Sequence, residues 1–164
     1  MDKKTDDFKK QITLYILFAV LMMILNYLIQ KINLLFIYPW INDNWSHIDF
    51  IYTFYISTNP YNMPELVGSI VAVGITYIIK YFLDKFIVFK KKTVELKETS
   101  IEFLKYFGFA ILTTIENIGI QFILTNFFNT PLEFSLVIAL TIGYITKFFL
   151  DRKYVFIGEE LAKT

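Results

Sequence analysis

Two copies of a lysine–aspartate pair are the residues of this chain whose types and spacing most directly suggest chemistry. Lys80 precedes Asp84 by four residues, and Lys147 precedes Asp151 by the same spacing. Residues four apart share one face of a helix, so a helix would hold each carboxylate beside its ammonium. Such a lysine can bind a phosphate, while the aspartate orients it and keeps it from holding the ligand too tightly. The candidate phosphate- and lipid-binding residues are Tyr77, Lys80, Asp84, Lys85, Tyr144, Lys147, Asp151 and Arg152.

Both pairs lie near the ends of apolar segments, which also allows a purely structural interpretation. A lysine stem can carry its ammonium to the membrane surface, with the aspartate as a local partner. Because the placement repeats, we weigh phosphate binding above this alternative.

Glu116 is a second candidate, because it interrupts a long apolar segment. It lies ten residues after Tyr106, about 15 Å along a helix and near the midplane of a bilayer. A lone charge at that depth costs several kcal/mol, so we expect Lys80 or Lys147 as its partner. It would line a path for a polar headgroup or titrate; the alternative is a packing contact between helices. The candidate polar path comprises Asn26, Glu116, Asn117 and Gln121.

The composition excludes several kinds of chemistry. The 164 residues include no cysteine and one histidine, His47, so disulfides, thiolate chemistry and multi-histidine metal sites are excluded. The sequence shows no phosphate-binding loop, nucleophile elbow or paired catalytic carboxylates. We therefore expect no catalytic residues, no cofactor, no metal and no nucleic-acid partner. Apolar residues make up 55% of the chain and charged residues only 19%, which is typical of a membrane protein rather than a soluble enzyme.

Four apolar segments are long enough to cross a bilayer as helices, which takes about 20 residues each. They predict an all-α membrane protein that forms a single membrane domain over 1–164. Thirteen of the 16 lysines and arginines lie in the two tails and the middle connection, so we expect both termini and that connection to be cytoplasmic. The aromatic-rich external segment 32–65 would be an interfacial loop or short helix, or a stacking surface for sugar rings. The predicted helices are 11–31, 66–89, 103–127 and 132–156, with a basic cytoplasmic loop at 90–102.

The second and fourth segments are copies of one another. Residues 77–89 align without a gap on 144–156, and eight of the 13 positions are identical, including the lysine and the aspartate. The first and third segments match more weakly, with Phe18-Ala19 on Phe109-Ala110 and Asn26 on Asn117. Two helices per copy indicate a parallel repeat, in which two helical hairpins have the same orientation.

The repeated endings, 84–89 and 151–156, resemble those of the GtrA-like family of small four-helix membrane proteins. The resemblance covers roughly residues 10–157. It implies a role in cell-surface polysaccharide synthesis, either moving polyprenyl-phosphate-linked sugars across the membrane or assisting the glycosyltransferase that makes them. It also implies the cytoplasmic membrane of a prokaryote.

We therefore expect the chain to bind and flip a polyprenyl phosphate or its monosaccharide conjugate, without making or breaking a bond. Its partners would be that lipid, the surrounding membrane lipids and a possible membrane glycosyltransferase. A homo-oligomer is expected, because four helices are thin walls for a polar headgroup. Two alternatives remain open: a non-transporting subunit that anchors a glycosyltransferase, and a small proton-coupled exporter that uses Glu116.

Overall fold

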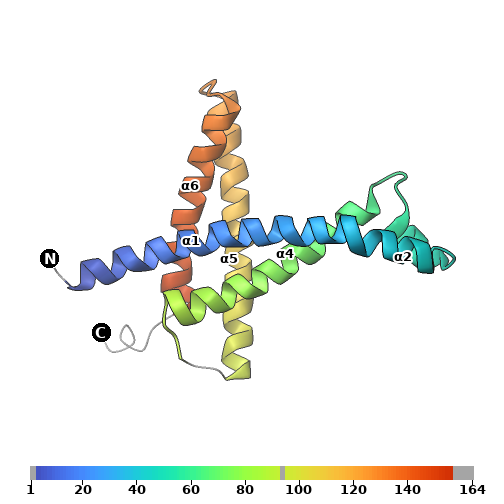
Figure 1. The fold of residues 1–164 in the computed structure, drawn as a ribbon. Helices are drawn as coiled ribbons and strands as arrows, with labels where there is room; N and C mark the ends of the chain where they lie inside the picture. Colours follow the sequence, from blue (N-terminus) through green and yellow to red (C-terminus); the bar gives the residue numbers. More distant parts are fainter. Residues whose placement is uncertain (1–2, 93–94, 157–164) are drawn as a thin grey trace. The chain divides into compact units, whose positions relative to one another are not determined.

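The computed structural model describes residues 3–92 and 95–156, and the regular structure in this part of the chain is entirely helical (Figure 1). Four helical segments are long and apolar enough to cross a membrane. Each exceeds the roughly 20 residues that a bilayer requires. The predicted all-α fold with four membrane-crossing segments is thus confirmed. The four segments are Asp6–Trp45, Met63–Val88, Leu96–Asn126 and Phe134–Val155.

The first helix extends well beyond its predicted bounds. α1 (Lys3–Ile32) continues through a π-helical turn, Asn33–Ile37, into α2 (Tyr38–Trp45). Pro39 lies in the first turn of α2, directly after the π-helical turn. Two further short helical pieces follow, so most of 33–56 is helical rather than a loop. These pieces are α3 (Asp49–Ile51) and a second π-helical turn, Tyr52–Ile56.

The remaining helices carry the repeated motif. α4 (Met63–Leu83) ends in the π-helical turn Asp84–Val88, and α6 (Leu132–Leu150) ends in the π-helical turn Asp151–Val155. Both turns begin at the repeated aspartate, and each is closed by the N–H of the phenylalanine that follows it. The repeat in sequence is therefore accompanied by a repeated backbone feature. A π-helical turn inserts one extra residue and is frequent at functional sites.

α5 (Leu96–Asn126) begins seven residues before its predicted start, so the connection after α4 is shorter than the expected 90–102 loop. The sequence boundaries followed the apolar residues, whereas the first turns of α1 and α5 carry charged side chains that a helix tolerates at its surface. α5 and α6 pack along one another (Figure 1). The short connection between them contains Asn129 at a φ of 49°, a left-handed conformation in which asparagine is enriched.

The chain divides into two compact units, and their bounds fall within α1 and at the end of α4. The first unit comprises the described residues of Met1–Ile16 and Leu83–Thr164, and the second comprises Leu17–Phe82. The division therefore does not follow the two sequence repeats. The start of α1 and the end of α4 belong with α5 and α6.

The second unit is built around the buried side chain of Asn33. Its amide nitrogen donates to the carbonyl of Pro64 at 2.9 Å, and its amide oxygen accepts from the hydroxyl of Tyr55 at 2.5 Å. Gly68 leaves the space that this amide fills, because a Cβ at that position would collide with it. Burial raises the pKa of Tyr55, and the hydrogen bond to Asn33 partly offsets the increase.

Candidate functional site

The first compact unit buries an unusual number of charges where α4 and α6 end and α5 begins. Asp84, Lys85 and Asp151 are fully enclosed, and Glu102 and Lys147 are 5% and 7% exposed. Charged side chains are rarely buried unless they are paired, because removing each from water costs several kcal/mol. The partners of these five groups therefore define the site.

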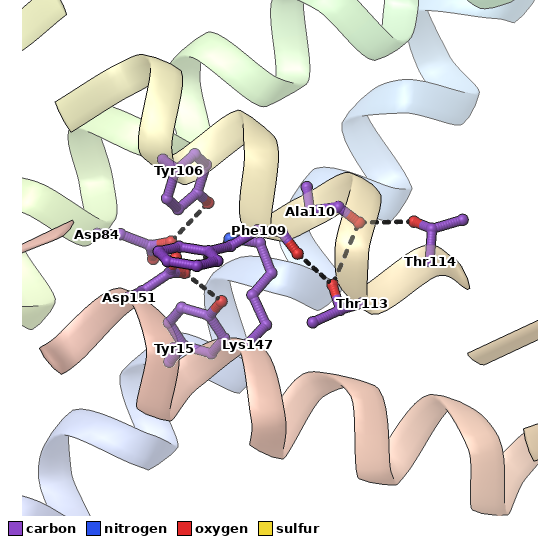
Figure 2. A network of polar contacts seen from close by, with 9 residues as sticks. All are labelled: Tyr15, Asp84, Tyr106, Phe109, Ala110, Thr113, Thr114, Lys147 and Asp151. Atoms are coloured by element: carbon purple, nitrogen blue, oxygen red, sulfur yellow. Dashed lines mark hydrogen bonds and ion pairs between the residues drawn. The ribbon is translucent and has the colours of Figure 1, made fainter. Parts of the chain in front are cut away.

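Asp151 receives two hydrogen bonds on one carboxylate oxygen (Figure 2). The hydroxyl of Tyr15 donates to Oδ2 at 2.8 Å, and the ammonium of Lys147 lies 2.7 Å from the same atom. That ammonium also lies 3.5 Å from the centre of the Tyr106 ring, a distance typical of a cation–π contact. The other oxygen, Oδ1, is buried and has no hydrogen-bond partner in the described part of the chain.

Asp84 is held in the same way by the other tyrosine. The hydroxyl of Tyr106 donates to Asp84 Oδ2 at 2.8 Å (Figure 2). The ungapped alignment of the first and third segments pairs Tyr15 with Tyr106, so the two tyrosines occupy equivalent positions in the repeat. Each therefore binds the aspartate of the opposite repeat copy. We call this arrangement the crossed tyrosine–aspartate pairs, Tyr15–Asp151 and Tyr106–Asp84.

An aromatic stack lies beside the crossed pairs. The rings of Phe89 and Phe156, which are equivalent in the repeat, stack with centres 4.8 Å apart and planes 18° apart. Tyr15 contacts the ring of Phe89, and Tyr106 contacts the ring of Phe156. Equivalent residues of two copies meet only close to the axis that relates them. The stack therefore marks a local pseudo-twofold axis, with the two carboxylates on either side.

The two aspartates also act on one another. Asp84 and Asp151 lie close enough to interact electrostatically, and their like charges repel. Lys147 binds Asp151 of this pair, and its ammonium also contacts the ring of Tyr106, so both contacts lie within the second copy. An anion that reached this ammonium would compete directly with Asp151 for it.

Lys85 belongs to a separate buried group. Its ammonium lies 2.8 Å from Glu102 Oε2 and donates to the hydroxyl of Thr99 at 2.9 Å. Lys91, from the connection after α4, binds the other oxygen of Glu102. This group joins the end of α4 to the first turns of α5 and leaves Lys85 with no exposed surface.

The other predicted binding residues are less enclosed. Arg152 is half-buried, and the centre of its guanidinium lies 4.8 Å from the centre of the Phe8 ring. Tyr144 is half-buried on α6. Tyr77 and Lys80 are half-buried on α4 within the second compact unit.

Glu116 is not paired with Lys147, one of the two partners that the sequence predicts. Its carboxylate accepts a hydrogen bond from the hydroxyl of Thr146 on α6 at 3.0 Å. The expected ion pair with Lys147 is wrong, because Lys147 follows Thr146 directly and points its ammonium to Asp151 instead. Lys80, the other expected partner, belongs to the second unit.

The rest of the predicted polar path is distributed over both units. Asn117 packs against Gly143 of α6, where a Cβ would collide with the asparagine amide. Gln121 is half-buried on α5. Asn26 lies in the second unit and accepts a hydrogen bond from Gln30 at 2.6 Å. The first unit thus brings together Glu116 and Asn117, both of which face α6.

Sequence reasoning missed three residues of the site: Tyr15, Tyr106 and Glu102. Extending the weaker repeat alignment by three residues toward the N-terminus pairs Tyr15 with Tyr106, so that signal was present in the sequence. The crossing of the two pairs had no such signal, because it depends on how the helices pack.

Comparison with known proteins gives one match. The family model described as GtrA/DPMS, transmembrane domain, matches residues 45–156, more than half of the chain. Searches of curated proteins and of solved structures gave no match. At the level of the family, this domain is associated with lipid-linked sugars and membrane glycosyltransferases, and it is generally a translocation domain rather than a catalytic one. The apolar helices and the matched domain together indicate an integral membrane protein. The chain belongs to the GtrA/DPMS transmembrane domain family.

Proposed function

We propose that this protein binds a polyprenyl phosphate, or a monosaccharide carried on it, and translocates it across the membrane for cell-surface polysaccharide glycosylation. The observation that carries the proposal is the buried Lys147–Asp151 pair beside the crossed tyrosine–aspartate pairs, all within membrane-spanning helices. A lipid phosphate must take its charge through an apolar layer, and a buried cation with an exchangeable anionic partner would lower that cost.

The binding step is an exchange of one anion for another at Lys147. A phosphate oxygen would take the place of Asp151 Oδ2, which lies 2.7 Å from the ammonium. Asp151 would retain its hydrogen bond from Tyr15, which offsets part of the cost of losing its cation. When the phosphate leaves, the carboxylate returns, which prevents the lysine from trapping the lipid. Lys80, the equivalent residue of the first copy, would bind the phosphate at another stage.

The sugar would follow the polar residues that face α6. Glu116 and Asn117 would accept and donate hydrogen bonds to its hydroxyl groups, with Gln121 further along α5. Within the second unit, Asn26 on α1 is proposed for the same role. No bond is made or broken, so the protein acts as a transporter rather than an enzyme. The distribution of lysine and arginine supports cytoplasmic termini. The family resemblance supports the inner membrane of a prokaryote. Four helices are few to enclose a polar headgroup, which supports a homo-oligomer.

The test is translocation in proteoliposomes. One leaflet carries a short-chain polyprenyl-phosphoryl sugar, and its exposure to a membrane-impermeant reagent is followed over time. Wild type should accelerate exposure relative to protein-free liposomes. Lys147→Ala alone would leave Asp151 as a buried unpaired charge, so the variant to use is Lys147→Met with Asp151→Asn, which removes both charges together. It should lose translocation, whereas Lys97→Gln, which removes an exposed charge from α5, should retain it.

A second candidate function is a subunit that anchors a glycosyltransferase without transport. The exposed lysines after α4, Lys90, Lys92 and Lys97, favour it, because they offer a basic surface to a partner. If wild type and protein-free liposomes match, transport by this chain alone is refuted. Co-purification with the glycosyltransferase should then survive the Lys147→Met/Asp151→Asn change and be lost on neutralising these exposed lysines.

A further inference from the structure

We propose that Arg152, together with the face of α1 beside it, is a binding site for the phosphate of an anionic lipid, and that only the second repeat copy offers this site. The inference deepens the proposed function and rests on it for the class of ligand. Arg152 aligns with Lys85 in the sequence repeat, and the two cations have different surroundings.

In the first copy the cation is already neutralised. Lys85 has no exposed surface, and its ammonium is 2.8 Å from Glu102 and 2.9 Å from the hydroxyl of Thr99. Lys91 adds a second cation to the same carboxylate. The ammonium of Lys85 is enclosed and already bound to a carboxylate, so it does not serve an external anion. Its role is to hold α5 against the end of α4.

Arg152, the equivalent cation of the second copy, lacks such a carboxylate. The alignment that pairs Tyr15 with Tyr106 places Phe8 opposite Thr99 and Gln11 opposite Glu102, so a neutral glutamine replaces the glutamate. In the part of the chain that the structure describes, no carboxylate lies within ion-pair distance of Arg152. Its guanidinium lies against the ring of Phe8 and is half-buried.

Gln11 supplies the second observation. Its side-chain oxygen is buried and has no hydrogen-bond partner in the described residues. Phe8 and Gln11 are three residues apart on α1 and therefore share a helix face. A terminal amide turned by 180° presents its NH₂ group instead of its oxygen, and the two orientations have nearly the same shape. The face that carries Phe8, beneath the guanidinium, thus also carries a half-buried amide that can donate to an anion.

The chemistry of this site fits a phosphate. A guanidinium presents planar donors that match two phosphate oxygens, and its contact with Phe8 fixes the plane in which they lie. Arg152 lies three residues before the end of the membrane-spanning segment Phe134–Val155, the depth at which lipid headgroups meet the protein. Lys153, exposed on the next residue, adds a positive charge.

The site is tested by calorimetric titration of the full chain in an uncharged detergent with farnesyl phosphate. Arg152→Gln removes the charge. Arg152→Gln and Gln11→Glu should both weaken binding about tenfold or more, as expected for losing a hydrogen bond between charged groups. Lys97→Gln, which removes an exposed charge from α5, is the matched control and should change affinity less than about twofold.

Two further probes distinguish the source of the phosphate. Inorganic phosphate tests the site without a lipid chain, and nanodiscs containing phosphatidylglycerol test ordinary membrane lipid. A loss of farnesyl phosphate binding alone assigns the site to the transported lipid, and a parallel loss with phosphatidylglycerol assigns it to lipid phosphates in general.

Unchanged affinity of Arg152→Gln and Gln11→Glu for all three probes would overturn the inference, as would an equal loss in Lys97→Gln. If Arg152→Gln lowers the melting temperature, Gln11→Glu carries the test, because it keeps the arginine. Failure of wild type to translocate lipid in proteoliposomes would refute the proposed function and leave these binding results untouched.

Discussion

The crossed tyrosine–aspartate pairs make a prediction that distinguishes this packing from any uncrossed one. Tyr15→Phe and Tyr106→Phe each remove one hydroxyl group and keep the ring that packs beside it. The hydroxyl–carboxylate distance is 2.8 Å in both pairs, and all four side chains are at most 1% exposed. A hydrogen bond to a charged group contributes about 1.5–3 kcal/mol, and water cannot replace it here. Each substitution should therefore lower the free energy of unfolding by about 2 kcal/mol.

Double-mutant cycles test the crossing itself. Tyr15→Phe combined with Asp151→Asn should show a coupling energy of about 1–2 kcal/mol, because the two side chains share a hydrogen bond. Tyr15→Phe combined with Asp84→Asn should be additive within about 0.5 kcal/mol. Tyr106 should show the reverse preference. For each tyrosine, the cycle with one aspartate thus serves as the matched control for the cycle with the other.

The assay is denaturant unfolding in mixed micelles, followed by circular dichroism. Every variant keeps the ring or the shape of the carboxyl group, so the helices should form in all of them. Coupling of Tyr15 to Asp84 in place of Asp151 would show that each tyrosine binds its own repeat copy. Absence of coupling in both cycles would show that the hydroxyl groups do not hold the carboxylates, and the description of the site would be wrong.

Three further predictions concern the supporting structure. Gly143→Ala should destabilise the α5–α6 contact by about 1–3 kcal/mol through a clash with Asn117, whereas Gly119→Ala, with nothing within 4 Å, should be neutral or stabilising in the same unfolding assay. Glu102→Gln should lower the free energy of unfolding by about 3–5 kcal/mol, since it leaves the fully buried Lys85 without its carboxylate. A decrease below about 1 kcal/mol would contradict the buried ion pair of Lys85 and Glu102. Burial raises the pKa of Tyr55 above its usual 10.0. The neutral hydroxyl of Tyr55 therefore contributes fully to folding stability below pH 10, and this contribution is lost as the pH rises through the pKa of the folded state. Wild type should accordingly lose more stability above pH 10 than Tyr55→Phe, and parallel pH profiles would refute this.

Much of the fold follows from the sequence because bilayer thickness leaves few choices. The length of the apolar segments predicts four crossing helices, and the 77–89 and 144–156 alignment predicts the repeat that the matching π-helical turns display. The ends of the helices were less predictable. Charged first turns, as in α1 and α5, still form helix when their side chains reach water. The length of an apolar segment therefore underestimates the length of the helix that contains it.

The site was only partly predictable, for a geometric reason. The spacing of Lys147 and Asp151 predicts their ion pair, because both lie on one helix. Of the two predicted partners of Glu116, Lys147 was wrong, because neighbouring residues such as Thr146 and Lys147 point about 100° apart around the helix axis. The crossing of Tyr15 and Tyr106 depends on contacts between helices, which a single sequence does not encode locally. The neutral Gln11 at the position of Glu102 becomes informative only once the structure shows what Glu102 does.

The central claim is that a lipid phosphate replaces the carboxylate of Asp151 at the buried ammonium of Lys147. The most direct measurement is the ³¹P–¹⁵N dipolar coupling by solid-state NMR, using ¹⁵N-lysine-labelled protein in proteoliposomes that contain a polyprenyl phosphate. We predict dephasing that corresponds to a direct phosphate–ammonium contact and that is weaker in Lys147→Met/Asp151→Asn, where Lys80 is the remaining repeated lysine. Dephasing of equal strength in that variant, or none in wild type at saturating lipid, would contradict the account.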